Sequence, residues 1–126
     1  MPTRGFTLLE MLIALAVIAV VGLTVSSAVG NVAAQTYTLE QRLVANWVAE
    51  NHLARARLSR IGTTDAMPTG RETERVRMSG RDWVLHRNIT ETTHPWLRRV
   101  EVQVYQVVDG DEIGPLDITV GFIGRY

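Results

Sequence analysis

The chain has 126 residues, with 13 basic and 13 acidic side chains and therefore no formal net charge at pH 7. This balance argues against a general nucleic-acid binder, in which a basic excess is expected, so we expect no nucleic-acid partner. All the basic residues are arginines and the sequence contains no cysteine, which excludes lysine-based catalysis, disulfides and thiolate metal ligands.

An apolar stretch of eighteen residues from Phe6 to Leu23 contains one ionisable group, Glu10. At about 1.5 Å per residue, a helix of this length crosses most of the hydrocarbon core of a bilayer. We therefore expect a transmembrane helix over residues 6–29, which leaves about ninety residues for a small head. A carboxylate inside a membrane helix is costly, so Glu10 is a candidate functional residue that needs a partner.

The segment around this carboxylate, Gly5-Phe6-Thr7-Leu8-Leu9-Glu10, resembles the processing site of the type IV pilin superfamily. The resemblance implies that residues 1–5 are a prepilin leader, that a prepilin peptidase cuts between Gly5 and Phe6, and that the new amino group of Phe6 is methylated. It also implies that Glu10 neutralises this amino group of a neighbouring subunit during filament assembly. Gly5 is consistent with such a cut, because glycine has no side chain that would keep a protease away from the backbone. A simpler interpretation makes Glu10 a first-turn acid that favours the helix dipole.

A secretory signal peptide, cleaved near Ser26-Ser27-Ala28, is the main alternative for the N-terminus. Glu10 interrupts the apolar run, and the run continues as a helical pattern beyond the proposed cut, so the alternative is disfavoured. Arg4 precedes the apolar run, and the next positive residue is Arg42. The positive-inside rule then predicts that residues 30–126 face away from the cytoplasm.

A second helical stretch runs from Thr36 to Ile61 and joins the first through the small residues 24–34. The two together predict one helix of roughly 56 residues that ends by Gly62. Its apolar positions recur at helical spacing and predict a stripe that a sheet covers. The stripe consists of Leu39, Leu43, Trp47, Ala54, Leu58 and Ile61. Arg55, Arg57 and Arg60 point in different directions around such a helix, which favours solvated side chains over a phosphate site.

Beyond the loop at residues 63–70 the apolar period changes from 3.6 to 2, which predicts strands. A hairpin is expected over residues 75–89, with Trp83, Leu85 and Ile89 on one face. The strongest strand runs from Leu97 to Val108 with Val100, Val102 and Val104 inward, and Ile118, Val120 and Phe122 mark a last strand. Turns are expected at Asp109–Glu112 and at Gly114–Pro115. The predicted fold is therefore α+β and pilin-like, one long helix followed by a small antiparallel sheet.

No catalytic constellation or cofactor site is apparent. The three histidines, His52, His86 and His94, show no metal-ligand spacing, so we expect neither a metal nor an enzyme. The acidic residues Asp109, Asp111 and Glu112 could bind calcium, but their spacing is that of a hairpin turn and not of an EF-hand loop.

Two further patterns resemble the I-type minor pseudopilin of the type II secretion system. They are Ala45-Asn46-Trp47-Val48-Ala49-Glu50-Asn51-His52-Leu53, an A-x-W-x-A-x-N-x-L helix segment, and Gly80-Arg81-Asp82-Trp83, a G-x-x-W strand. On packing grounds alone, Trp47 and Trp83 are large core residues, one from each layer.

This resemblance implies a tip subunit with a single membrane span in the bacterial inner membrane and a periplasmic head. Such a subunit joins J-type and K-type partners through its helix, and helps to initiate a pseudopilus that exports folded proteins across the outer membrane. The helix residues that we expect to meet these partners belong to the apolar stripe and are Leu39, Leu43, Trp47 and Leu58, and H-type and major pseudopilins are further candidate partners. Alternatives are a minor type IV pilin for pilus assembly, adhesion or DNA uptake, and a membrane-tethered enzyme.

Overall fold

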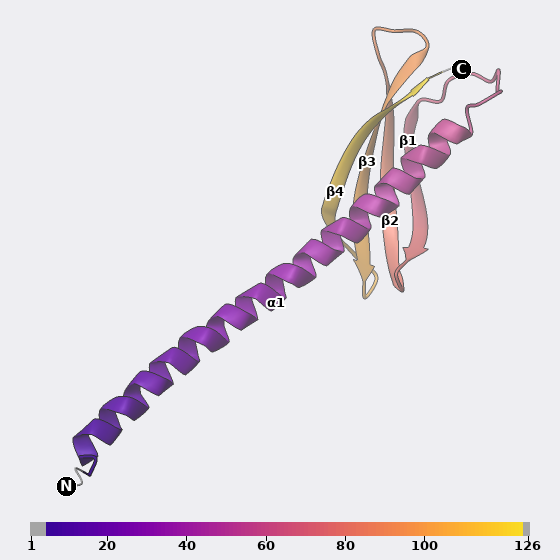
Figure 1. The fold of residues 1–126 in the computed structure, drawn as a ribbon. Helices are drawn as coiled ribbons and strands as arrows, with labels where there is room; N and C mark the ends of the chain where they lie inside the picture. Colours follow the sequence, from indigo (N-terminus) through magenta and orange to yellow (C-terminus); the bar gives the residue numbers. More distant parts are fainter. Residues whose placement is uncertain (1–4, 125–126) are drawn as a thin grey trace. The chain divides into compact units, whose positions relative to one another are not determined.

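The computed structural model describes residues 5–124 and has the predicted α+β architecture (Figure 1). One helix, α1 (Leu8–Leu58), is followed by four strands, β1 (Gly70–Met78), β2 (Arg81–Glu91), β3 (Leu97–Val108) and β4 (Asp111–Gly124). The strands form one antiparallel sheet in the order β1-β2-β3-β4. The chain divides into two compact units between Thr38 and Leu39, and the second unit, called the head below, contains the end of α1 and the whole sheet.

Helix α1 begins where Thr7 caps it. The Thr7 hydroxyl accepts a hydrogen bond from the Glu10 backbone N–H at 3.2 Å, and the Thr7 carbonyl accepts from Met11 N–H. The helix has 51 residues, somewhat fewer than predicted, because it starts after this cap and loosens into turns beyond Leu58. Gly62, with a φ of 73°, lies in those turns, as expected for a residue after a helix.

The first part of α1 is apolar and exposed along its whole length. From residue 8 to residue 40 every side chain is exposed. Among the described residues α1 is the helix that is long and apolar enough to cross a membrane. A soluble helix normally buries one stripe, so an apolar helix that buries none here requires a non-aqueous environment or other helices around it.

Two tight turns join the strands of the two β-hairpins. The turn at Ser79–Gly80 has φ values of 54° and 70°, and the turn at Asp109–Gly110 has φ values of 53° and 91°. Positive φ at both central positions matches the right-handed twist of paired strands. The first hairpin and the turn after Val108 are therefore confirmed, although β1 starts at Gly70, earlier than predicted.

The prediction of a turn at Gly114–Pro115 is wrong, because both residues lie inside β4. The pairing of β3 with β4 shifts register between Val104 and Gln106, and Gly114 has a φ of 145° next to this irregularity. Proline and glycine are tolerated in an edge strand at such a bulge, because no ladder hydrogen bond is lost there.

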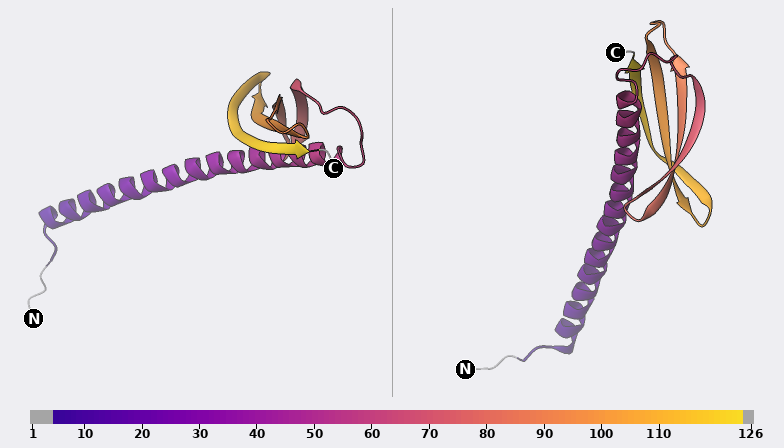
Figure 2. Two further views of the ribbon diagram at one scale, coloured as in Figure 1. Left: turned by 90° about the horizontal axis from the view of Figure 1, so that it is seen from above. Right: turned by 90° about the vertical axis from the view of Figure 1, so that its right-hand side faces the viewer.

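The core of the head lies between α1 and one face of the sheet (Figure 2). The strand faces were predicted correctly, since Trp83, Leu85 and Ile89 are buried together with the inward valines of β3. The helix contributes small and β-branched side chains, which let the helix approach the sheet closely. These helix residues are Val44, Ala45, Val48, Ala49 and Leu53.

The predicted helix stripe does not face the sheet. Leu39 is 67% exposed and Trp47 is 52% exposed, and Leu43, Leu58 and Ile61 are exposed as well. The interpretation of Trp47 as a core residue is therefore wrong, whereas Trp83 is fully buried. The physical reason is that α1 is apolar on two opposite faces. Apolar spacing alone cannot say which of two such faces the sheet covers.

Candidate functional site

The predicted cleavage site lies in the short exposed segment before α1. Gly5 and Phe6 are exposed and not helical, and a Cβ atom at Gly5 would meet no atom within 4 Å. Phe6 is 81% exposed. Exposed, non-helical backbone is where proteases cut most readily, so the geometry is compatible with processing between these two residues. The rest of the leader, residues 1–4, lies outside the described residues, and so does Arg4, on which the predicted orientation depends.

Glu10 is exposed in the first turn of α1, at the third position after the capping residue Thr7. A threonine followed three residues later by a glutamate is the spacing of a capping box, so the dipole interpretation of Glu10 fits its position. The same position places the carboxylate beside the N-terminal end of the helix. From there it can meet an amino group of another subunit.

The residues predicted to bind partners form an exposed apolar row on the helix side opposite the sheet. We call this row the α1 stripe, and it consists of Leu39, Leu43, Trp47 and Leu58. Leu39, Leu43 and Trp47 follow one another at a spacing of four residues and so form one patch, and monomeric soluble proteins rarely expose contiguous large apolar patches unless the surface binds something.

Five polar contacts between α1 and the sheet hold the α1 stripe outward. They come from both flanks of the helix and from its buried side, so rotation of the helix about its axis would break several at once. The pairs are Glu40 with Arg81 at 3.2 Å, Gln41 with Gln106 at 3.1 Å, Asn46 with Asp117 at 3.0 Å, His52 with Glu74 at 2.9 Å, and Arg57 with the Phe122 carbonyl at 3.2 Å.

Sequence reasoning missed these contacts. Arg60 was expected to be solvated but is buried, and it donates to the Asp65 carbonyl at 2.7 Å. Arg57 is exposed as expected, yet it also reaches β4. The acceptor of each of these arginines is a backbone carbonyl. Every residue has one, so no residue type in the sequence marks the partner.

His52 is the one helix histidine and its side chain is mostly buried at the junction with β1. Its Nδ1 atom lies 2.9 Å from Glu74 Oε2, and its Nε2 atom is buried without a hydrogen-bond partner. Burial lowers the pKa of His52 below 6.5; Glu74 partly opposes this shift, and the nearby Arg87 and Arg55 add to it. The imidazole is therefore a neutral structural group at neutral pH.

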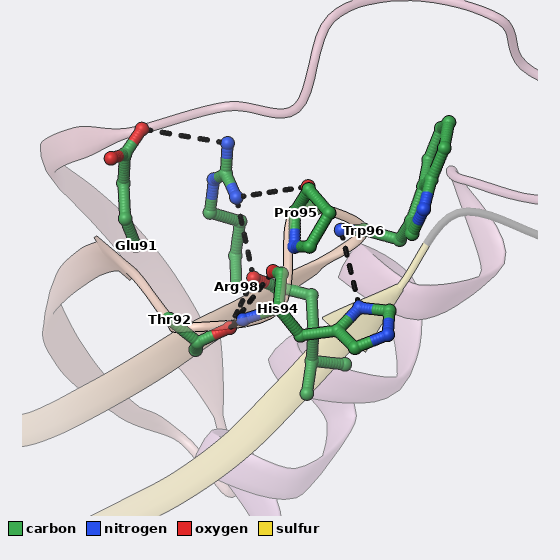
Figure 3. A network of polar contacts seen from close by, with 7 residues as sticks. Glu91, Thr92, His94, Pro95, Trp96 and Arg98 are labelled. Carbon is green, nitrogen blue, oxygen red and sulfur yellow. Dashed lines mark hydrogen bonds and ion pairs between the residues drawn. The ribbon is translucent and has the colours of Figure 1, made fainter.

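The loop between β2 and β3 is held by its own side chains (Figure 3). The Thr92 hydroxyl accepts from His94 N–H at 3.2 Å and lies 2.8 Å from the Leu97 carbonyl, to which it donates. His94 Nδ1 accepts from Trp96 N–H at 3.4 Å. Arg98 closes the loop through the Pro95 carbonyl and Glu91. His94 therefore stabilises the conformation of the loop backbone.

The acidic turn and the remaining histidine give no metal site. Asp109 and Gly110 form the turn between β3 and β4, while Glu112 lies 2.7 Å from His86 Nε2 on the sheet. Among residues 5–124, no three His, Cys, Asp or Glu residues are grouped so that they could hold a metal ion.

The sequence is similar to known proteins over most of its length. The family model described as type II secretion system (T2SS), protein I matches residues 39–123, and the prokaryotic N-terminal methylation motif matches residues 1–26. The type II secretion system protein I of Pseudomonas aeruginosa is 33% identical over 126 residues, covering 96% of this chain and 95% of that protein. The protein of the same name from Aeromonas hydrophila is 36% identical over 83 residues, covering 66% of each chain, and that from Escherichia coli is 32% identical over 101 residues, covering 80% and 79%. The chain therefore belongs to the type II secretion system protein I family.

Proposed function

We propose that this chain, a minor pseudopilin of the type II secretion system, assembles with other minor pseudopilins at the pseudopilus tip. There it helps to initiate the filament and supports export of folded proteins across the outer membrane. The observation that carries the proposal is the α1 stripe, which is apolar and exposed although the opposite face of the same helix is fully used by the head's own core. The relatives favour this role over that of a minor type IV pilin.

The chain is first processed at its N-terminus. Prepilin peptidase removes residues 1–5 by cutting between Gly5 and Phe6, and methylates Phe6. Residues 6–29 then anchor the protein in the bacterial inner membrane, and residues 30–126, which include the head, lie in the periplasm. The methylation-motif match and the exposed position of Gly5 and Phe6 support this order of events.

Glu10 acts in assembly. Inside a bundle of apolar helices, a carboxylate without a partner is costly, so it pairs with the amino group of Phe6 of a neighbouring subunit. Its place in the first turn of α1, at the end of the helix that carries the processed amine, supports this role.

The partners that meet the α1 stripe are J-type and K-type minor pseudopilins, with H-type and major pseudopilins as further neighbours. Tryptophan is enriched among the residues that dominate binding energy, and the leucines beside Trp47 supply apolar ridges that can pack into the grooves of another helix. No catalytic step is part of this function.

Co-purification of the full chain with tagged J-type and K-type subunits from membranes tests the proposal. Trp47→Glu, on the α1 stripe, should reduce recovery of the partners, because it places a charge in an apolar interface. Arg75→Glu, on the exposed opposite edge of the head, is the matched control and should leave recovery unchanged. Equal recovery with Trp47→Glu and the parent would rule out docking through the α1 stripe.

A further inference from the structure

Between Asp117 and Phe122, strand β4 carries its apolar side chains on the face away from the core, and only beyond them does an apolar residue, Ile123, enter the core. Ile118, Val120 and Phe122 are 53%, 45% and 48% exposed. The alternate positions Asp117, Thr119 and Gly121 lie on the face toward α1, since successive side chains of a strand point to opposite faces. A strand with one buried face normally shows the reverse pattern, apolar inward and polar outward. We call Ile118, Val120 and Phe122 the β4 stripe.

Contacts on the inner face show that this orientation is built into the fold. Asp117 Oδ2 accepts from Asn46 Nδ2 of α1 and from the Thr119 hydroxyl, each at 3.0 Å. Gly121 faces Leu53 so closely that there is no room for a side chain. A slip of one residue would exchange the two faces and drive a large side chain into Leu53. The β4 stripe is therefore fixed outward by the polar and glycine positions that alternate with it.

The neighbouring row on β3 forms a polar margin beside the β4 stripe. By register, Arg99, Glu101 and Gln103 pair with Phe122, Val120 and Ile118. Glu101 accepts from Arg99 at 3.1 Å and from Gln103 at 3.0 Å, and the Tyr105 hydroxyl donates to Gln103 at 3.1 Å. These side chains already satisfy one another. The apolar row and its satisfied polar margin have the anatomy of a protein interface, and they fit an apolar occupant better than a charged one.

Addition of a foreign strand to the edge of β4 is disfavoured at the Phe122 end. The Arg57 guanidinium of α1 donates its Nε–H to the Phe122 carbonyl at 3.2 Å, so this backbone acceptor is taken by the chain itself. At this end of β4, a partner therefore meets the outer face, where the side chains are, and not the backbone edge.

The strand that carries the β4 stripe is held against the flank of α1 that borders the α1 stripe. Asn46 and Arg57, which contact β4, lie on the helix flank between its buried face and its exposed face; Asn46 is three residues from Leu43, and therefore its neighbour on the helix surface. A stable protein interface takes about 800 Å² and about 20–30 residues from each partner. The α1 stripe alone is too narrow to supply this, so a subunit docked there extends over an adjacent surface, and β4 offers an apolar one.

We infer that one neighbouring pseudopilin subunit covers both stripes: an apolar helix face of that subunit packs on the α1 stripe, and an apolar surface of its head packs on the β4 stripe. This inference rests on the proposed function, because it extends the α1 contact onto the sheet. It adds Ile118, Val120 and Phe122 to the residues that select the partner.

Photo-crosslinking in cells tests this inference with the full chain. The photoreactive amino acid p-benzoylphenylalanine is placed singly at Trp47, at Val120 or, as a control on the opposite edge of the sheet, at Arg75. The chain is co-expressed with differently tagged J-type and K-type subunits. Trp47 and Val120 should give an adduct with the same subunit, and Arg75 should give none with it.

The other outcomes separate the inference from the proposed function. An adduct from Trp47 without one from Val120, or with a different subunit, overturns the inference and leaves the α1 contact intact. An adduct between two copies of this chain at Val120 overturns the proposed occupant. Adducts from neither position overturn the α1 contact and the inference together.

A polar double variant supplies the quantitative test. Val120→Thr combined with Phe122→Thr places β-branched side chains, which suit a strand, at both positions and removes apolar area only on the outer face. Partner recovered from detergent-solubilised membranes should fall about fivefold or more, because loss of central apolar anchors has effects of this size. Arg75→Thr is the matched control. Unchanged recovery, with protease resistance of the head equal in all three proteins, would overturn the inference.

Discussion

A Cβ atom placed on Gly121 would lie 2.3 Å from Cδ2 of Leu53, which is closer than real Cβ contacts allow. Strand β4 and helix α1 thus touch at this point with no space for a methyl group. Leu53 is itself buried, and it packs among the core residues of the head.

Gly121→Ala should therefore destabilise the head. The added methyl group forces Leu53 or the strand to move, a cost of about 1–3 kcal/mol in a well-packed core. Urea unfolding followed by near-ultraviolet circular dichroism, which reports on the buried Trp83, measures the change. Gly124→Ala is the control on the same strand, because its nearest atoms lie at an ordinary 3.7 Å. Equal urea midpoints for the two variants would show that Leu53 can move aside without a loss of stability.

The second prediction concerns pH and His52. Its pKa in the folded head lies below 6.5, mainly because of burial, so between this pKa and 6.5 the unfolded chain binds more protons than the folded one. The free energy of unfolding should therefore fall as the pH is lowered through 6.5. Above that value, the contribution of the neutral His52 to this free energy should be fully present. Unfolding midpoints measured from pH 7.5 to pH 5 check this.

His52→Gln removes the titrating ring and should flatten that dependence, whatever it does to stability at pH 7. The pKa of Glu101 is lowered by its hydrogen bonds from Gln103 and Arg99, so its contribution is lost only as the pH falls below about 4.5. The two groups therefore act in separate pH windows. The same slope from pH 7.5 to pH 5 in the parent and in His52→Gln would contradict the assignment to His52.

The third prediction concerns processing. Co-expression with a prepilin peptidase should shorten the chain by its residues 1–5 and add one methyl group to Phe6, which an intact-mass spectrum detects. Gly5→Val should block the cut, because a branched side chain obstructs access to the backbone there. A cut near Ala28, with loss of the whole apolar segment, would instead identify a secretory signal peptide.

The fourth prediction concerns Glu10. Glu10→Gln keeps the length and the helix propensity of the side chain but removes its charge, so the cut after Gly5 and the fold of the head should persist. Recovery of partner subunits and secretion of an exported protein should both decrease, because the amino group of Phe6 in a neighbour loses its counter-charge. Parent-like secretion at matched expression would show that helix packing alone carries the contact.

Strands β2 and β3 could be predicted because each has a buried face with a period of two. Val100, Val102 and Val104 alternate with polar residues, and this alternation alone determines which side of β3 faces the helix. The turn at Asp109–Gly110 was equally clear from its residue types.

The orientation of α1 could not be predicted in the same way. Its buried face uses Ala45 and Ala49, which weigh little in a hydrophobic pattern, whereas its exposed face carries the larger Leu43 and Trp47. The pattern therefore favours the face that is open to partners over the face that builds the core. The apolar pattern of β4 likewise points to its outer face, whereas the contact of β4 with α1 depends on Gly121, a residue without a side chain.

The two faces of α1 also separate two kinds of mutational constraint. A substitution at Val48 or Ala49 perturbs a core made wholly of the chain's own residues, and its effect appears in the isolated protein. A substitution at Leu43 or Trp47 leaves that core untouched. The outer face can therefore change together with a changing partner while the head keeps its stability, so its residues should vary between species in step with those of the partner.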